Sequence, residues 1–166
     1  MTILSATALS STACGMITAS GGSAESVSCT TEFRFGTAEP LGLISRFADQ
    51  SNAAAETGDP TTLRAIADSA GWQGGWDRLV EVPQDITTDE LNRRTGTTSA
   101  CWENMPTKSD AGGPTKGYYL FLNGTQPIQT TSWYGKADHA ISFEGAEQIL
   151  ADTPLIGTGQ GALRPA

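Results

Sequence analysis

Histidine, cysteine and basic residues are scarce in this sequence, and each scarcity argues against a class of site. The 166 residues include one His and three Cys, whereas a zinc site needs three or four clustered Cys, His or carboxylate ligands. We therefore expect no metal. Ten Lys and Arg stand against 18 Asp and Glu, for a net charge of −8. This balance argues against nucleic acid, because binding it depends on neutralising phosphates.

Long hydrophobic runs and phosphate-binding loops are missing as well. No run reaches the ~20 apolar residues of a membrane-spanning helix, so we expect contact with a membrane only through a lipid anchor. Gly71, Gly74 and Gly75 precede a predicted strand, whereas the glycines of a pyrophosphate-binding motif open a helix. The sequence therefore predicts no cofactor.

The single histidine suggests one candidate catalytic site. Asp138 and His139 are adjacent, and a triad with Ser132 or Ser142 is conceivable on paper. No Gly-x-Ser-x-Gly elbow is present, and a single histidine in a polar stretch is usually just exposed. We therefore assign no catalytic residue and keep a secreted hydrolase as the alternative function.

The N-terminal residues are typical of an exported protein. Residues 1–13 are uncharged, small or apolar, and the sequence around Cys14 resembles a bacterial lipobox, with Ser11 where that pattern prefers an aliphatic residue. We interpret residues 1–26 as a signal-peptide remnant with a lipobox and a flexible tether, and Cys14 as the lipidation site. The alternative is a disordered tail with an incidental thiol.

The other two cysteines are then left to form a pair. A disulfide between Cys29 and Cys101 suits an oxidising compartment outside the cytoplasm, so the predicted location is extracytoplasmic, anchored to the membrane or secreted. Closing a loop of this length stabilises the fold by about 4 kcal/mol in the chain-entropy model.

Residues 27–156 are predicted to form one α+β domain. We predict an antiparallel sheet of about four strands with helices on one face, in the order β-α-α-β-α-β-β and a short last helix. The predicted strands are Val27–Phe35, Gly75–Pro83 and the two arms of a hairpin that turns at Asn123-Gly124.

Three predicted helices follow from their caps. The first starts near Pro40, the second takes Asp59 as its N-cap, and the third takes Thr87 with Glu90 in a capping box. Residues 97–116 are predicted as a long loop, residues 142–150 as the short last helix and residues 157–166 as a loose tail.

Tryptophans are the candidate ligand-binding residues. Aromatic residues beside glycine-rich segments can form a binding platform, and Trp72 and Trp102 both fall in predicted loops. Trp133 is included, although core packing is the stronger expectation for it.

The segment Trp76-Asp77-Arg78-Leu79-Val80, the capped helix and the hairpin from Tyr118 to Gly124 together resemble a group of small bacterial envelope lipoproteins. The resemblance covers roughly residues 72 to 143, and its motifs are structural. It implies an anchored, non-enzymatic domain and identifies no active-site residue.

These observations favour a non-catalytic binding or inhibitory module of the cell envelope. The expected partner is another protein or a cell-envelope glycan, and we expect the chain to be a monomer.

Overall fold

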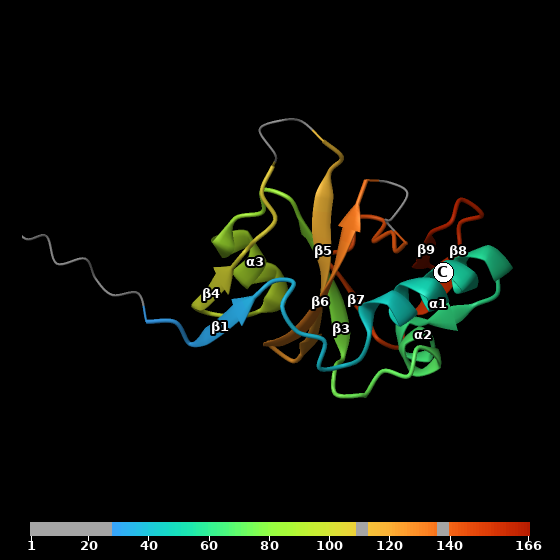
Figure 1. Cartoon of the computed structure of the whole chain (residues 1–166), viewed down its shortest axis with the longest axis horizontal. Helices are drawn as coiled ribbons and strands as arrows, with labels where there is room; N and C mark the ends of the chain where they lie inside the picture. The colour runs from blue at the N-terminus through green and yellow to red at the C-terminus, as the bar shows by residue number, and fades with distance from the viewer. Residues whose placement is uncertain (1–27, 109–112, 136–139) are drawn as a thin grey trace, which may run out of the picture.

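The computed structural model describes residues 28–108, 113–135 and 140–166. In these ranges there are three helices and nine strands (Figure 1). In chain order they are β1 (Thr31–Arg34), α1 (Ile44–Thr57), β2 (Thr61–Thr62), α2 (Leu63–Ser69), β3 (Arg78–Pro83), α3 (Thr88–Thr95), β4 (Ala100–Glu103), β5 (Lys116–Asn123), β6 (Gln126–Tyr134), β7 (Gln148–Leu150), β8 (Pro154–Gly157) and β9 (Leu163–Pro165).

The centre of the fold is a four-stranded sheet in the order β6-β5-β3-β7, and every neighbouring pair is antiparallel. The α+β class and the four-stranded antiparallel sheet are confirmed. The predicted hairpin joins β5 to β6, and Gly124 takes the positive φ of 55° that the turn requires.

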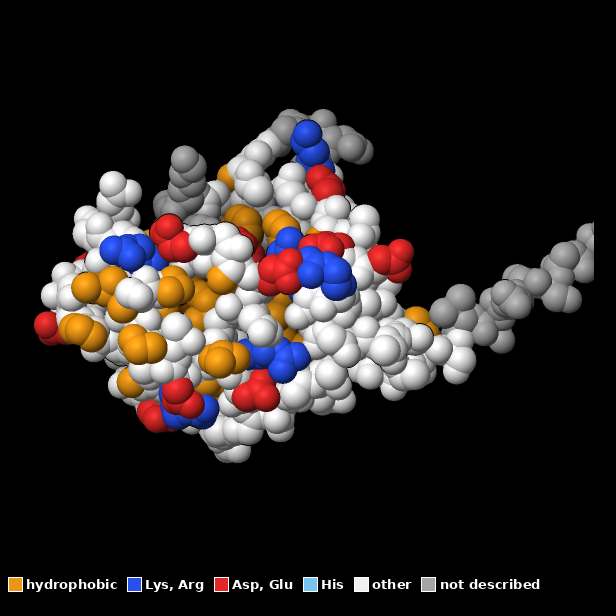
Figure 2. Space-filling model, turned by 180° about the vertical axis from the view of Figure 1, so that it is seen from behind, with side chains coloured by type: hydrophobic (Ala, Val, Ile, Leu, Met, Phe, Trp, Pro, Cys, Tyr) orange, Lys and Arg blue, Asp and Glu red, His pale blue; other side chains and the backbone are white. Residues whose placement is uncertain are grey.

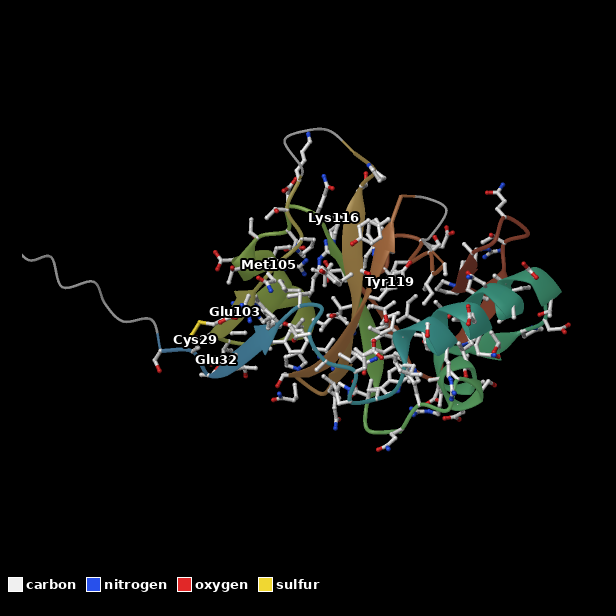
Figure 3. The ribbon with its side chains drawn as sticks, in the orientation of Figure 1. Cys29, Glu32, Glu103, Met105, Lys116 and Tyr119 are labelled. Carbon is white, nitrogen blue, oxygen red and sulfur yellow. A yellow bond between two sulfur atoms is a disulfide. The ribbon has the colours of Figure 1, made fainter. Side chains whose placement is uncertain are left out.

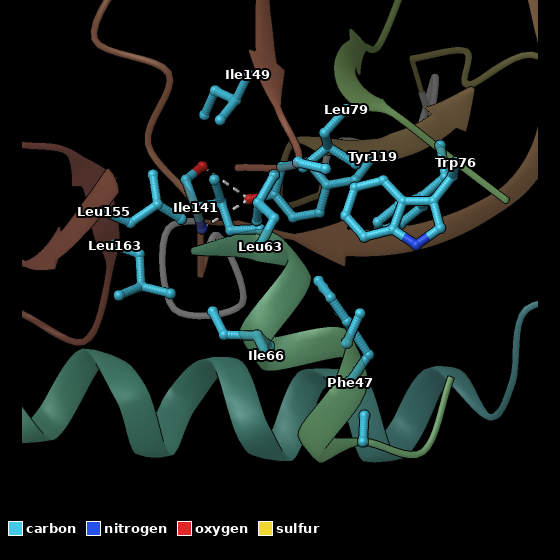
Figure 4. Close-up of a cluster of buried hydrophobic side chains, with 14 of the residues drawn as sticks. Phe47, Leu63, Ile66, Trp76, Leu79, Tyr119, Ile141, Ile149, Leu155 and Leu163 are labelled. Carbon is cyan, nitrogen blue, oxygen red and sulfur yellow. Dashed lines mark hydrogen bonds between the residues drawn. The ribbon is translucent and has the colours of Figure 1, made fainter. Parts of the chain in front are cut away.

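Helices and loops cover both faces of this sheet, because successive strand residues point to opposite sides. Leu79, Tyr119 and Phe121 pack with α1 and α2 in the larger core (Figure 4). Val80 and Leu120 face the other way, in a smaller core that includes residues of β1 and α3. The prediction of helices on one face is therefore wrong: Figure 1 shows α3 on one side of the sheet and α1 and α2 on the other.

The first strand is part of a separate two-stranded sheet. β1 pairs in parallel with β4, with Phe33 opposite Trp102. The predicted loop over residues 97–116 therefore contains a strand, and not all neighbouring strands are antiparallel. A parallel arrangement is possible here because three helices and two strands, β2 and β3, separate β1 from β4 along the chain.

Strand pairing also moves the start of α2. Thr61 and Thr62 pair with β8, so the helix begins after them, and the Thr62 hydroxyl accepts the Ala65 N–H at 3.1 Å. An N-cap at Asp59 would place Thr61 and Thr62 in the first turn of the helix, where they could not pair with β8. The N-cap is therefore Thr62 and not Asp59. The Thr87 cap is confirmed, since its hydroxyl accepts the Glu90 N–H at 3.2 Å.

The predicted last helix and loose tail are wrong. Glu144 and Gly145 have positive φ values of 50° and 86°, which form a turn, and residues 148–150 continue as β7 beside β3. The C-terminal residues form β9, which pairs with β8. Leu163 in β9 is completely buried, and this burial explains why the tail is ordered.

Candidate functional site

One enclosed candidate site lies between α1 and the outer edge of β6. Its cavity of about 310 Å³ is at the lower end of the range of small-molecule sites, roughly 300–1,000 Å³. We call it the edge pocket. Its lining residues are Phe47, Ala48, Ser51, Asn52, Tyr119, Thr131, Ser132, Tyr134, Ala140 and Ile141.

The sheet supplies one wall through two paired residues. Tyr119 of β5 lies opposite Thr131 of β6, so both side chains project from the same face of the sheet. Both residues are buried, and they form the inner end of the pocket.

Tyr119 also fixes the wall formed by Ala140 and Ile141. Its hydroxyl donates to the Ile141 carbonyl at 3.0 Å and accepts the Ile141 N–H at 3.1 Å, as Figure 4 shows. Burial raises the pKa of the Tyr119 hydroxyl well above its usual value. The tyrosine is therefore a neutral structural bridge at physiological pH.

Helix α1 supplies the opposite wall, and its inner part is already fixed by packing. The Phe47 ring stacks on Trp72 with the ring centroids 4.6 Å apart, and the Ser51 hydroxyl donates to the Phe47 carbonyl at 2.8 Å. Asn52 is exposed. Its amide offers both a donor and an acceptor at the rim.

Thr131 has a hydroxyl whose hydrogen-bonding capacity is unused. Its Oγ1 is buried and has no hydrogen-bond partner among the described residues. A buried hydroxyl without a partner costs about 1–3 kcal/mol, and such groups call for an explanation such as an absent ligand or water. This one lies in the wall of the edge pocket.

The described lining of the edge pocket carries no Asp, Glu, Lys, Arg or His side chain. The pocket can therefore offer hydrogen bonds and apolar contacts to a ligand. Its described lining has no charged side chain to form an ion pair with a ligand. Across the part of the chain that the structure describes, no group of three or more His, Cys, Asp and Glu residues is placed to hold a metal ion.

The three candidate tryptophans do not form an exposed platform. Trp72 and Trp133 are each only 6% exposed and belong to the larger core, and the Trp72 indole donates to the Leu43 carbonyl at 2.9 Å. Trp102 packs against the smaller core, and its indole donates to Asn92 Oδ1 at 2.8 Å. Their role here is packing, and none of the three lines the edge pocket.

The predicted disulfide is confirmed, since Cys29 and Cys101 are bonded. It joins Cys29, two residues before β1, to the parallel partner strand β4, at the end of the molecule remote from α1 (Figure 3). Cys14 falls among residues 1–27, which the structure does not describe.

The hydrolase alternative depends on two residues that lie outside the described ranges. Asp138 and His139 fall in the gap at residues 136–139. Ser142 donates to Glu144 Oε1 at 3.2 Å and is not part of the pocket lining. Ser132 lines the pocket, but it lies opposite Tyr118, so its side chain projects from the sheet face opposite to Thr131.

Two other surface features lie outside the edge pocket. Arg93 bridges Glu90 and Glu147 in an exposed ion-pair cluster. Figure 2 shows hydrophobic side chains gathered on the half of the molecule that holds β8 and β9. Leu150 is 55% exposed, and a shallow hollow beside it also contains the Arg64–Asp152 ion pair. Both features are more open than the edge pocket.

Sequence reasoning missed the edge pocket, although one signal was present. Gln129 and Thr131 are polar residues at positions of β6 that face inward, beside Phe121 and Tyr119. Gln129 is explained by structure, because its amide binds the backbone of Leu41 and Gly42. Thr131 has no such explanation, so an inward polar residue was the available sign of a site.

Comparison with protein-family models, with curated proteins and with solved structures gives no match for this chain. No helix among the described residues has the length and apolar character needed to cross a membrane.

Proposed function

We propose that this protein is an extracytoplasmic binding module, attached to the membrane through a lipid on Cys14, which holds its ligand in the edge pocket without converting it. The observation that carries the proposal is the cavity of about 310 Å³ between α1 and the outer edge of β6. The Cys29–Cys101 disulfide supports an oxidising compartment.

The chemistry of the described pocket lining supports binding over catalysis. Its polar side chains are hydroxyls and one amide, and general acid-base catalysis normally uses a His, carboxylate or Lys with a shifted pKa. Tyr119, whose pKa is raised, uses its hydroxyl to hold Ile141. An uncharged ligand is the best complement to this lining.

A pocket-filling substitution tests the site. Ala48→Phe places a ring inside the edge pocket, whereas Ala53→Phe places the same ring on an exposed position of the same helix. With a library of uncharged fragments, we expect NMR shift changes in the parent and in Ala53→Phe to map to Ser51, Thr131 and Ile141. They should disappear in Ala48→Phe. Fragment shifts that avoid these residues in the parent would refute the site.

The anchor is tested by Cys14→Ser. A diacylglyceryl thioether would provide the main hydrophobic attachment, so the variant should be released into the medium while the parent sediments with membranes. Equal sedimentation of the two proteins would remove the lipid anchor from the proposal.

The hydrolase alternative is separated by His139→Ala. Turnover of ester, peptide or glycan substrates by the parent, abolished in this variant, would replace the binding proposal. We expect no turnover by either protein.

A further inference from the structure

The hydrogen-bond pattern of β6 fixes which backbone groups face the edge pocket. The Gly135 N–H donates to the Thr115 carbonyl at 2.6 Å, which makes these two residues a hydrogen-bonded pair of the antiparallel ladder. Such pairs alternate along the strands. Thr131 and Trp133 are thus bonded to β5, while the N–H and C=O groups of Ser132 and Tyr134 point to the outside of the sheet.

These outward groups border the pocket. Ser132 and Tyr134 are both part of its lining, and no backbone hydrogen bond joins either residue to any described loop. Since their side chains project from the opposite face of the sheet, they contribute backbone to the pocket wall. A strand edge of this kind is a template for a further strand.

Two residues of β6 before Ser132 are already bonded to another part of the chain. The Gly36 N–H donates to Thr130 Oγ1 at 3.0 Å, and Leu41 and Gly42 bind the Gln129 amide at 2.8 and 3.0 Å. The segment after β1 therefore contacts β6 at Gln129 and Thr130. The open edge begins at Ser132, where the edge pocket lies.

We propose that the edge pocket binds an extended, uncharged peptide segment of a partner protein, which adds to β6 as a fifth strand of the central sheet. The proposal rests on the proposed function, since it names the ligand class of the same pocket. Ser132 and Tyr134 offer four backbone groups, repeating every two residues, or about 7 Å. Another extended backbone has this repeat, and a sugar ring does not. Strand addition of this kind is a general mode of peptide recognition.

The pocket also selects the side chain of the added strand. A residue paired next to Ser132 directs its side chain to one of the two faces, and on the α1 side it meets Phe47, Tyr119 and Thr131. This part of the wall is neutral. A charged side chain buried there would lose its hydration without gaining an opposite charge from the described lining. The bound side chain is therefore uncharged and small enough for the cavity.

Two variants at one residue separate backbone recognition from side-chain recognition. Ser132→Pro removes the outward N–H, and an outward position of an edge strand is one that tolerates proline. Ser132→Ala keeps the N–H and removes only the hydroxyl. A library of displayed random heptapeptides is selected on the parent, and each enriched peptide is measured on both variants.

We expect enriched, uncharged peptides that bind Ser132→Ala like the parent and lose about tenfold or more in affinity on Ser132→Pro, equivalent to one or two hydrogen bonds. Absence of enriched peptides, or equal binding to Ser132→Pro, overturns the proposal. If fragments still map to the edge pocket in that case, the proposed function stands without it.

Amide hydrogen exchange of the parent gives a readout that needs no variant. In the free protein, Ser132 and Tyr134 should exchange faster than Thr131 and Trp133, and a selected peptide should slow the first pair. Unchanged exchange at Ser132 and Tyr134 contradicts strand addition. Chitotetraose serves as the glycan probe: if it binds the edge pocket and displaces the selected peptides, the ligand is a glycan and the peptide proposal fails.

Discussion

Tyr119 holds together two parts of the protein that are separated along the chain. Its hydroxyl bridges the N–H and C=O of Ile141, which belongs to the far wall of the edge pocket. Both groups are buried, so removal of the hydroxyl leaves them without this partner.

Tyr119→Phe should therefore lower the free energy of unfolding by about 1–3 kcal/mol. Urea denaturation measures this change. Tyr118→Phe is the matched control, because no hydrogen bond of its hydroxyl to a described residue is present, and its stability should stay within about 0.5 kcal/mol of the parent. Equal losses in the two variants would show that the Ile141 bridge is not the cause.

Gly117 allows the Trp133 ring to lie directly on β5. A Cβ at this position would overlap the Trp133 ring and would approach the Val82 carbonyl oxygen to 2.6 Å. Glycine is required here by close approach and not by its backbone angles.

We expect Gly117→Ala to destabilise the fold by about 1–3 kcal/mol through overpacking, visible as a lower melting temperature. Gly74→Ala introduces the same methyl group where no atom lies within 4 Å, so its melting temperature should change little. A parent-like melting temperature for Gly117→Ala would mean that Trp133 can move aside without cost.

At the scale of elements, β9 supports the edge pocket from behind. Leu163 is completely buried, and its N–H donates to the Ala140 carbonyl at 2.8 Å. The C-terminal strand thus positions the segment that forms the far wall of the pocket.

Leu163→Ala should cost about 2–5 kcal/mol, as truncation of a buried leucine usually does. It should also broaden the NMR signals of Ala140 and Ile141. Arg164→Ala alters the exposed neighbour in the same strand and should leave both stability and these signals unchanged. If the two variants behave alike, β9 does not support the wall.

Helix α3 is joined to the rest of the fold by arginines. Arg93 binds Glu90 and Glu147, and Arg94 binds Glu90 and the Glu81 carbonyl. Hydrogen bonds from Arg93 and then Arg94 lower the pKa of Glu90 to about 2. A hydrogen bond from Arg93 also lowers the pKa of Glu147.

Because the folded pKa of Glu90 lies below the value of about 4.3 expected in the unfolded chain, its contribution to stability is present above that value. The contribution is lost as the pH falls toward 2. We expect Arg93→Gln to lower the melting temperature slightly at pH 6, and by less at pH 2.5 or in high salt, since the cluster is exposed.

Arg46→Gln removes an exposed arginine that has no ion pair among the described residues and should show no such pH dependence. A difference between Arg93→Gln and the parent that persists unchanged at pH 2.5 would exclude the carboxylates as the cause.

At the scale of the whole molecule, the disulfide links two segments 72 residues apart in the sequence. β1 and β4 form a sheet with only two strands, and a sheet of this size has little stability of its own. The crosslink therefore maintains the end of the molecule that covers the smaller core.

Reduction of Cys29–Cys101 should lower stability by about 4 kcal/mol in the chain-entropy model, or roughly 10 °C in melting temperature at 2–4 °C per kcal/mol. Hydrogen exchange should increase first in β1 and β4. Protein recovered from the cell envelope should carry this bond in mass spectra of non-reduced peptides. Pairing of Cys14 with either cysteine would contradict both the disulfide and the anchor assignment.

The sequence alone determined the features that depend on a few neighbouring residues. Thr87 caps α3 because a hydroxyl three residues before the Glu90 N–H is already in reach, and Asn123-Gly124 turns the hairpin because glycine adopts positive φ without strain. The alternation of side-chain character in β3 likewise specified two faces. The cysteine count predicted the disulfide.

Tertiary structure decided the features in which distant segments compete for the same residues. Residues 148–150 could form a helix by composition, yet β3 provides strand partners and a buried position for Ile149. Thr61 and Thr62 are drawn out of α2 by β8. The edge pocket arises in the same way, since α1, β6 and Ile141 meet only after Tyr119 and β9 fix the chain. Hydrogen bonds and burial between segments far apart in the sequence produce no local sequence pattern from which these features could be predicted.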